Sequence, residues 1–296
     1  MQQLSPAQQY DANLAAMRHT EYMDYPSHVH IETLARCNAA CYFCPYPVLD
    51  RKGTQMDDTL INKILADLAD IPRHLPLQLS PFKVGEPFLD SRLFDILHRI
   101  NAELPNANIS LTSNASPITE KTLLALTKIR NIKYLWISFN DHREAEYEQA
   151  MRLPYKRTIE RLDMIHDQLT DGKLRFRVTL SRVGDQGGVD REFAEWISRR
   201  YPAFTVSIFP RAAWLGQVDV EVGPVPNIGC NRWFELSITA TGVVAHCCTD
   251  GQAEWPIGDV TDQHVLEIYN SPHYRALRES TVSRLQAEPC NQCTFT

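Results

Sequence analysis

Short apolar segments alternate with longer amphipathic segments through the middle of the chain. The short segments are rich in β-branched and aromatic residues, which is typical of buried parallel strands, and the longer ones have the apolar spacing of helices. The predicted strands are His28–Leu34, Leu77–Phe82, Asn108–Thr112, Lys133–Ser138, Leu174–Leu180 and Phe204–Phe209. The predicted helices are Asp57–Asp70, Ser91–Glu103, Thr119–Lys128, Tyr155–Leu169 and Arg191–Arg200.

Strands that alternate with helices in this way predict βα units with right-handed crossovers, and therefore a parallel sheet. Six units are too few to close an eight-stranded barrel, so we expect an α/β fold built as an open, partial (βα)6 barrel. Functional sites in such sheets lie at the carboxyl ends of the strands. The loops that follow the strands are therefore where we expect functional residues.

The pattern changes toward the C-terminus. Trp233–Ile238 and Val243–His246 flank a Thr-Ala-Thr-Gly turn, which predicts a β-hairpin. Two short helical segments follow, Val265–Tyr269 and Tyr274–Leu285. We therefore expect three parts: an N-terminal extension over residues 1–27, a core over 28–215 and a small hairpin-and-helix domain over 216–296.

Composition excludes several classes of function. The chain has 296 residues, of which 44% are hydrophobic and 22% charged, as in an ordinary globular protein. A net charge of −6 gives no basic surface for nucleic acid. The sequence has no apolar stretch near the roughly 20 residues of a membrane helix and no signal peptide at its start. We therefore expect a cytoplasmic protein with no nucleic-acid or membrane partner, whose eight cysteines do not form disulfides.

Three of the cysteines follow the first predicted strand, as Cys37-x3-Cys41-x2-Cys44. Soft thiolates favour iron–sulfur clusters or zinc. Three closely spaced cysteines can hold three corners of a [4Fe-4S] cubane and leave the fourth iron open to a ligand. A zinc knuckle is the alternative. Structural zinc sites need four ligands, however, and no fourth Cys or His follows at a short spacing.

This motif, after the first strand of a six-unit βα domain, resembles the signature of the radical S-adenosylmethionine (SAM) superfamily. The resemblance covers the chain from about Val29 to Phe209. It implies that the cluster at the three cysteines binds SAM and cleaves it reductively to a 5′-deoxyadenosyl radical. It also implies that Phe43, just before the third cysteine, packs near the adenine.

The resemblance extends to the ends of later strands. Gly85-Glu86-Pro87 resembles the family's "GGEP" turn, which binds the amino group of methionine, although Val84 replaces the first glycine. Asn114 and Asn140 can instead serve to form turns, and Arg182 can instead be a solvated loop residue. The residues that the resemblance assigns to SAM are Phe43, Gly85, Glu86, Pro87, Ser113, Asn114, Ser138, Asn140 and Arg182.

The remaining cysteines lie near the C-terminus, at positions 230, 247, 248, 290 and 293. Their spacing resembles the shortened "twitch" form of the SPASM domain and implies one auxiliary [4Fe-4S] cluster; a four-cysteine zinc ribbon is the alternative. Because side chains alternate along a strand, only one of Cys247 and Cys248 should face this cluster, and we favour Cys247. His246 is expected to face outward.

The implied activity is that of a radical SAM oxidoreductase on a small polar metabolite, such as a carbohydrate or aminocyclitol, with the auxiliary cluster as electron acceptor. A flavodoxin or ferredoxin would supply the electron. A peptide-modifying maturase is the alternative, although such enzymes usually carry a leader-peptide recognition domain, which the first 25 residues do not resemble. A non-catalytic iron–sulfur protein or a zinc-binding protein is the alternative of another class. The catalytic acid or base stays unassigned among Glu146, Arg152, Asp219 and Glu221.

Overall fold

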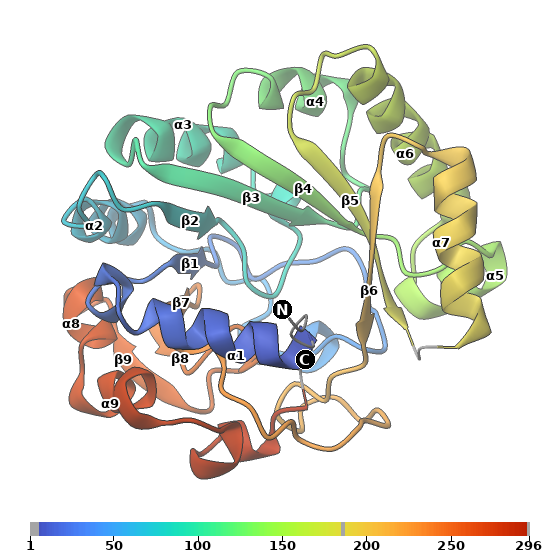
Figure 1. Ribbon diagram of the computed structural model, residues 1–296. Helices are drawn as coiled ribbons and strands as arrows, with labels where there is room; N and C mark the ends of the chain where they lie inside the picture. Colours follow the sequence, from blue (N-terminus) through green and yellow to red (C-terminus); the bar gives the residue numbers. More distant parts are fainter. Residues whose placement is uncertain (1–5, 185–186, 295–296) are drawn as a thin grey trace, which may run out of the picture.

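The computed structural model describes residues 6–184 and 187–294 (Figure 1). One sheet runs through it, in the strand order β6-β5-β4-β3-β2-β1-β7-β8-β9. Its first six strands are parallel and curve into a partial barrel, which confirms the predicted fold class. These strands are β1 (His28–Ile31), β2 (Leu77–Ser80), β3 (Ala107–Ser113), β4 (Ile132–Ser138), β5 (Arg177–Gly184) and β6 (Thr205–Pro210).

Helices cover the outer face of this curved sheet (Figure 1). They are α2 (Asp58–Leu68), α3 (Leu93–Glu103), α4 (Glu120–Leu126), α5 (Glu144–Met151), α6 (Tyr155–Thr170) and α7 (Gly188–Arg200). Helix α3 shows why they form, because its buried residues Leu93, Leu97 and Ile100 share one face. Helix α5 was not predicted, since only Tyr147 and Met151 of its eight residues are buried and the rest of its sequence is mostly polar.

The C-terminal hairpin continues the barrel sheet instead of forming a sheet of its own. Strand β7 (Glu235–Ile238) pairs in parallel with β1, so that Glu235 lies beside His28. The remaining elements are β8 (Val243–Ala245), β9 (Pro256–Asp259), α8 (Val265–Tyr269) and α9 (Pro272–Ser280). Strand β9 was not predicted, because its sequence Pro-Ile-Gly-Asp has little intrinsic strand preference.

The N-terminal helix α1 (Pro6–Met17) lies against this C-terminal part (Figure 1). The Tyr10 hydroxyl donates to Asn231 Oδ1 at 2.9 Å, and Arg18 donates to the carbonyl of Thr281. Short 3-10 helices complete the fold, at Glu21–Met23, Tyr46–Val48, Pro87–Leu89, Asn231–Phe234, Arg284–Gln286 and Cys290–Gln292.

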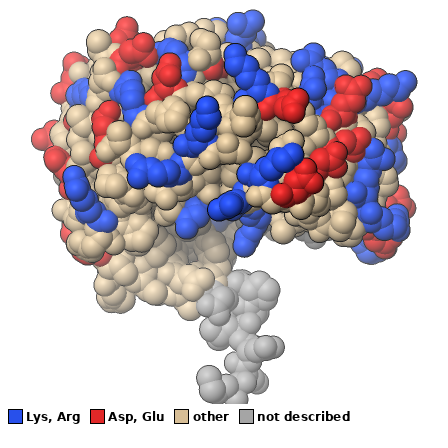
Figure 2. All heavy atoms as spheres, turned by 90° about the horizontal axis from the view of Figure 1, so that it is seen from above, with Lys and Arg blue, Asp and Glu red and all other residues tan. Residues whose placement is uncertain are grey.

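The surface carries both signs of charge. Figure 2 shows basic and acidic side chains interspersed on the face seen from above, as a net charge of −6 without a charge run leads one to expect. Among the described residues, every helix is too short or too polar to cross a membrane.

Glu32, just after β1, joins three segments that are far apart in the sequence. Its buried carboxylate accepts two hydrogen bonds from Arg51, at 2.6 and 2.9 Å. It also accepts from the backbone N–H groups of Val84 at 3.1 Å and Ala240 at 3.0 Å. Arg51 lies in the loop between β1 and α2, called the cysteine loop because it carries the three motif cysteines; Val84 lies in the turn after β2, and Ala240 lies in the hairpin turn. One desolvated charge thus holds the loop, the barrel and the C-terminal part together.

Replacing this charge should destabilise the whole chain. We expect Glu32→Gln to lower the free energy of unfolding by about 3–5 kcal/mol, because Arg51 would stay buried without its partner. Urea denaturation followed by circular dichroism measures the change. The control is Glu279→Gln, whose pair with Arg275 is half-exposed and should contribute less than about 1 kcal/mol. Equal losses in the two variants would contradict the joining role.

Candidate functional site

A cavity of about 410 Å³ lies at the carboxyl ends of the barrel strands and extends to the C-terminal part. It brings together most of the residues singled out from the sequence. Those that line it are Cys37, Cys41, Phe43, Cys44, Gly85, Glu86, Ser113, Asn114, Ser138 and Cys248.

The three motif cysteines lie together in this cavity on the loop after β1. Cys37 Sγ accepts from the Ala39 N–H at 3.4 Å and lies 3.9 Å from Asn114 Nδ2, while Cys41 Sγ lies 3.5 Å from Met151 Sδ. Burial raises the pKa of Cys37 to about 12 and that of Cys44 to about 11, because a thiolate there loses its hydration. A metal would supply the compensating charge and release the protons. Three soft donors converging on one cavity fit an iron–sulfur cluster with three protein ligands.

The turn after β2 packs directly on the backbone of the cysteine loop. The Glu86 N–H donates to the Arg36 carbonyl at 2.8 Å. A Cβ atom at Gly85 would lie 2.8 Å from the Leu34 carbonyl oxygen and 3.0 Å from that of Arg36. Only glycine therefore lets the two backbones approach this closely.

The Glu86 carboxylate is bonded within the protein. It accepts from the Asn114 N–H at 2.7 Å and from Ser113 Oγ at 2.9 Å, which ties the turn after β2 to the end of β3. Burial raises the pKa of Glu86 to about 7, and these hydrogen bonds oppose the rise. The side chain thus joins two segments of the cavity wall, the turn after β2 and the end of β3.

A methyl group at Gly85 should disturb the cysteine loop. We expect Gly85→Ala to lower both the melting temperature and the iron bound by the three motif cysteines, because two carbonyl groups must move. Gly188→Ala is the control, since a Cβ atom there has open space around it. Iron analysis after anaerobic reconstitution and thermal melts of both variants make the comparison. Full iron content in Gly85→Ala would contradict the close packing.

Three of the residues assigned to SAM lie elsewhere among the described residues. Pro87 begins a 3-10 helix, and Asn140 and Arg182 line a neighbouring cavity of about 370 Å³ that also contacts Phe43. Asn140 has a positive φ of 66° and accepts from the Val183 N–H at 2.9 Å, so it holds the turn after β4. Arg182 donates to Asp190 at 2.6 Å and to Asp141 at 2.8 Å. Its guanidinium is therefore paired within the protein, and a role toward SAM stays a prediction.

The five C-terminal cysteines divide between two cavities. Four of them line a second, narrower cavity: Cys230, Cys247, Cys290 and Cys293. Cys248 instead lines the main cavity, with its Sγ 2.5 Å from Arg232 Nη1. Arg232 and Thr249 line both cavities and form the partition between them. Adjacent thiols thus face opposite sides of one wall, although they lie in the bend after β8 and not on the strand itself.

The expectation that His246 faces outward is wrong. This side chain is 3% exposed and lines the second cavity, with Nε2 3.2 Å from Cys290 Sγ. Trp233 Nε1 also donates to Cys290 Sγ, at 3.3 Å. Helix α9 covers this side of the hairpin, where the Tyr274 hydroxyl donates to the His246 carbonyl at 3.2 Å. A hairpin sequence alone does not reveal that a later helix packs over it.

None of the four acid/base candidates lines the main cavity as the described residues form it. Arg152, Asp219 and Glu221 are exposed, and Glu146 lines the neighbouring cavity. The polar groups that do line the main cavity include His30, Lys83 and Arg232, none of which was predicted from the sequence. The spacing of His28 and His30 was a usable signal, because residues two apart on a strand face the same side.

Comparison with known proteins covers both parts of the chain. Residues 230–294 match the SPASM model, described as an iron–sulfur cluster-binding domain. An S-adenosyl-L-methionine-dependent 2-deoxy-scyllo-inosamine dehydrogenase of Niallia circulans is 21% identical over 271 residues, which are 90% of this chain and 92% of the relative.

Two solved structures share the fold. BtrN in complex with AdoMet and 2-DOIA superposes with a TM-score of 0.63 at 20% identity, over 91% of this chain and 93% of that one. Streptococcus suis SuiB bound to the precursor peptide SuiA gives a TM-score of 0.66 at 13% identity, over 97% of this chain and 74% of that one.

Proposed function

We propose that this radical SAM enzyme, which carries a SPASM-type cluster-binding domain, oxidises a hydroxyl group of an aminocyclitol or a related small polar metabolite to a carbonyl group. The domain match and the shared fold confirm the family resemblance seen in the cysteine motif. The observation that carries the proposal is the arrangement of the cavities. The motif cysteines share one cavity with Arg232, and the four-cysteine cavity lies directly behind that arginine.

The ligands follow from this arrangement. We assign Cys37, Cys41 and Cys44 to the cluster that binds SAM, and Cys230, Cys247, Cys290 and Cys293 to a second [4Fe-4S] cluster. The chemistry that these groups supply when bound is removal of a hydrogen atom from a substrate C–H bond and acceptance of one electron. A flavodoxin or ferredoxin is the proposed source of the electron that starts each turnover.

The chain's own residues bind and orient the substrate. The main cavity has room for a small molecule, and its wall combines aromatic side chains such as Trp136 and Phe82 with the polar groups of His30, Lys83 and Arg232. Such a wall suits a ring that carries hydroxyl and amino groups. The partition of Arg232 and Thr249 keeps the substrate side apart from the second cluster site and leaves only one layer of side chains between them.

The extent of the similarity favours a small metabolite over a peptide. The inosamine dehydrogenase and this chain match over about nine tenths of both lengths, so the likeness includes the core and the C-terminal domain. The peptide-bound SuiB is matched over 74% of its own length. A peptide substrate is therefore kept as an outcome of the test.

The two neighbouring cysteines give a matched test of the ligand assignment. We expect about eight irons per reconstituted chain, and about four after Cys247→Ala, because one cluster would lose a ligand. Cys248→Ala should keep about eight, since its thiol lies on the other side of the partition. Iron and sulfide analysis with electron paramagnetic resonance of the reduced proteins measures both. If only Cys248→Ala lost iron, Cys248 and not Cys247 would be the ligand. If zinc were found in place of the second cluster, the proposal of a second iron–sulfur cluster would fail.

The reaction itself is tested with 2-deoxy-scyllo-inosamine and a panel of related aminocyclitols and inositols, each deuterated at its carbinol carbons. With SAM and dithionite we expect deuterium in the 5′-deoxyadenosine. We also expect one molecule of carbonyl product for each molecule of 5′-deoxyadenosine. The Cys37→Ala variant is the control and should form neither product. Absence of 5′-deoxyadenosine in the wild type would favour a non-catalytic iron–sulfur or zinc protein. Turnover of a peptide and of no panel member would favour the maturase alternative.

A further inference from the structure

We propose that His30, positioned by Glu235, accepts the hydroxyl proton when the substrate alcohol becomes a carbonyl. This inference rests on the proposed oxidation and names the catalytic residue that the sequence left unassigned.

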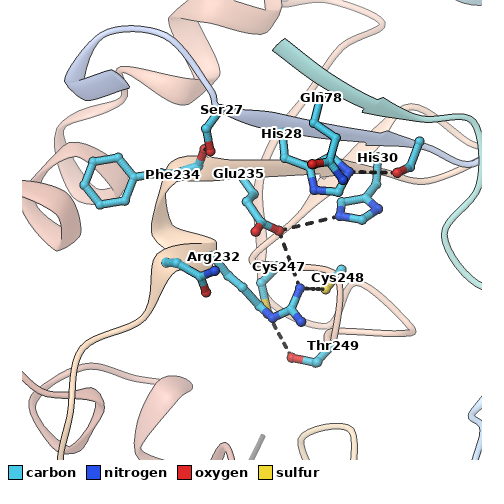
Figure 3. A network of polar contacts seen from close by, with 12 residues as sticks. Ser27, His28, His30, Gln78, Arg232, Phe234, Glu235, Cys247, Cys248 and Thr249 are labelled. Atoms are coloured by element: carbon cyan, nitrogen blue, oxygen red, sulfur yellow. Dashed lines mark hydrogen bonds and ion pairs between the residues drawn. The ribbon is translucent and has the colours of Figure 1, made fainter. Parts of the chain in front are cut away.

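The pairing of β1 with β7 places the two side chains together. His28 and Glu235 are direct neighbours in the parallel register, and His30 lies two residues further along β1 on the same face. Glu235 Oε2 is 3.5 Å from His30 Nε2 (Figure 3). A carboxylate at this nitrogen favours the tautomer that carries its proton there, which leaves Nδ1 free to accept a proton.

His30 also lacks the hydrogen bonds that a buried imidazole normally makes. The residue is 8% exposed and its ring forms part of the main cavity wall. Neither ring nitrogen makes a hydrogen bond of ordinary geometry with the described residues. Nε2 has only the Glu235 carboxylate at 3.5 Å, and the buried Nδ1 atom has no partner among the described residues, which points to a ligand that completes it.

The chemistry of the oxidation requires such a group. Removal of a hydrogen atom from the carbon that bears the hydroxyl leaves one unpaired electron on that carbon. The carbonyl forms when the O–H bond breaks, its proton passes to the imidazole, and one electron passes to the iron–sulfur cluster at the C-terminal cysteines. The proton and the electron therefore leave the substrate together, and the atoms and charges balance.

The residues around Glu235 connect the proton acceptor with the electron acceptor. Arg232 Nη1 lies 3.5 Å from Glu235 Oε2, the same oxygen that faces His30 (Figure 3). Arg232 is also part of the partition between the two cavities. Both acceptors thus lie on the same side of the substrate cavity.

A line of polar side chains leads from His30 into the barrel interior. The rings of His30 and His28 are 4.0 Å apart between centroids. His28 Nε2 is 2.7 Å from Ser80 Oγ, which is 2.6 Å from Ser110 Oγ. A second imidazole and two hydroxyl groups thus lie next to His30 on the side of His28.

The charges around His30 set the direction of the pH dependence. Burial lowers the pKa of His30, the carboxylate of Glu235 raises it, and the cations of Arg232 and Lys83 lower it; His28 packs against the ring from the same strand. The net effect is a pKa below the ordinary value of about 6.5. The imidazole is therefore neutral near pH 7 and can accept a proton. Carbonyl formation should rise with pH through this pKa and be lost below it.

The test compares His30→Gln with Glu235→Gln in the reconstituted holoenzyme, using the deuterated panel member that the wild type oxidises best. For His30→Gln we expect deuterium transfer to 5′-deoxyadenosine to persist while carbonyl product per 5′-deoxyadenosine falls about 100-fold, because proton transfer follows hydrogen abstraction. The acidic limb of the pH profile should disappear. In Glu235→Gln the limb should move to lower pH, since the carboxylate raises the pKa of His30.

His74→Gln is the matched control, because His74 also faces a glutamate, Glu21 at 2.7 Å, but is exposed at the surface. It should leave the product ratio and the pH profile unchanged, and all three variants should keep their full iron content. An unchanged ratio in His30→Gln would overturn the inference, as would an equal loss of 5′-deoxyadenosine and carbonyl. If the wild type oxidises no panel member, the proposed function fails first and the inference with it.

Discussion

The buried carboxylate of Glu32 is the constraint on which the architecture depends. A charge without access to water needs several donors, and this one takes them from Arg51, Val84 and Ala240. These residues belong to the cysteine loop, the turn after β2 and the C-terminal hairpin. The position of the motif cysteines relative to the second cysteine group is therefore fixed by one desolvated group. Strand β1, which ends at Ile31 just before Glu32, also carries His30 into the cavity wall.

The continuous sheet brings the two groups of cysteines close together. Strand β7 joins the barrel at β1, so the C-terminal cysteines come to the mouth of the barrel instead of to a separate domain. Arg232 and Thr249 line both the main cavity and the second cavity and so lie between them, as the described residues form them. The adjacent thiols of Cys247 and Cys248 face opposite sides of this partition. A single layer of side chains between the two cavities would suit electron transfer between groups bound in them without direct contact.

Glu86 and Asn140 were both expected to contact SAM, and both use their side chains within the protein. The Glu86 side chain binds the end of β3, and the Asn140 side chain holds the turn after β4. Both place backbone around a cavity and use their side chains within the protein. Each of these residues thus contributes to the cavity through the geometry of the loop that it stabilises.

The sequence by itself determined the class of fold and the three-cysteine motif. Alternating apolar segments fix a βα repeat through local hydrogen bonding and burial, and Cys37, Cys41 and Cys44 are close together because they are close along the chain. The tertiary structure decided the rest. His30, Lys83 and Arg232 meet across more than 200 residues, and His246 is buried by a helix that follows it. Such contacts depend on which strand pairs with which and on where charge is buried, and the spacing of residues along the chain records neither.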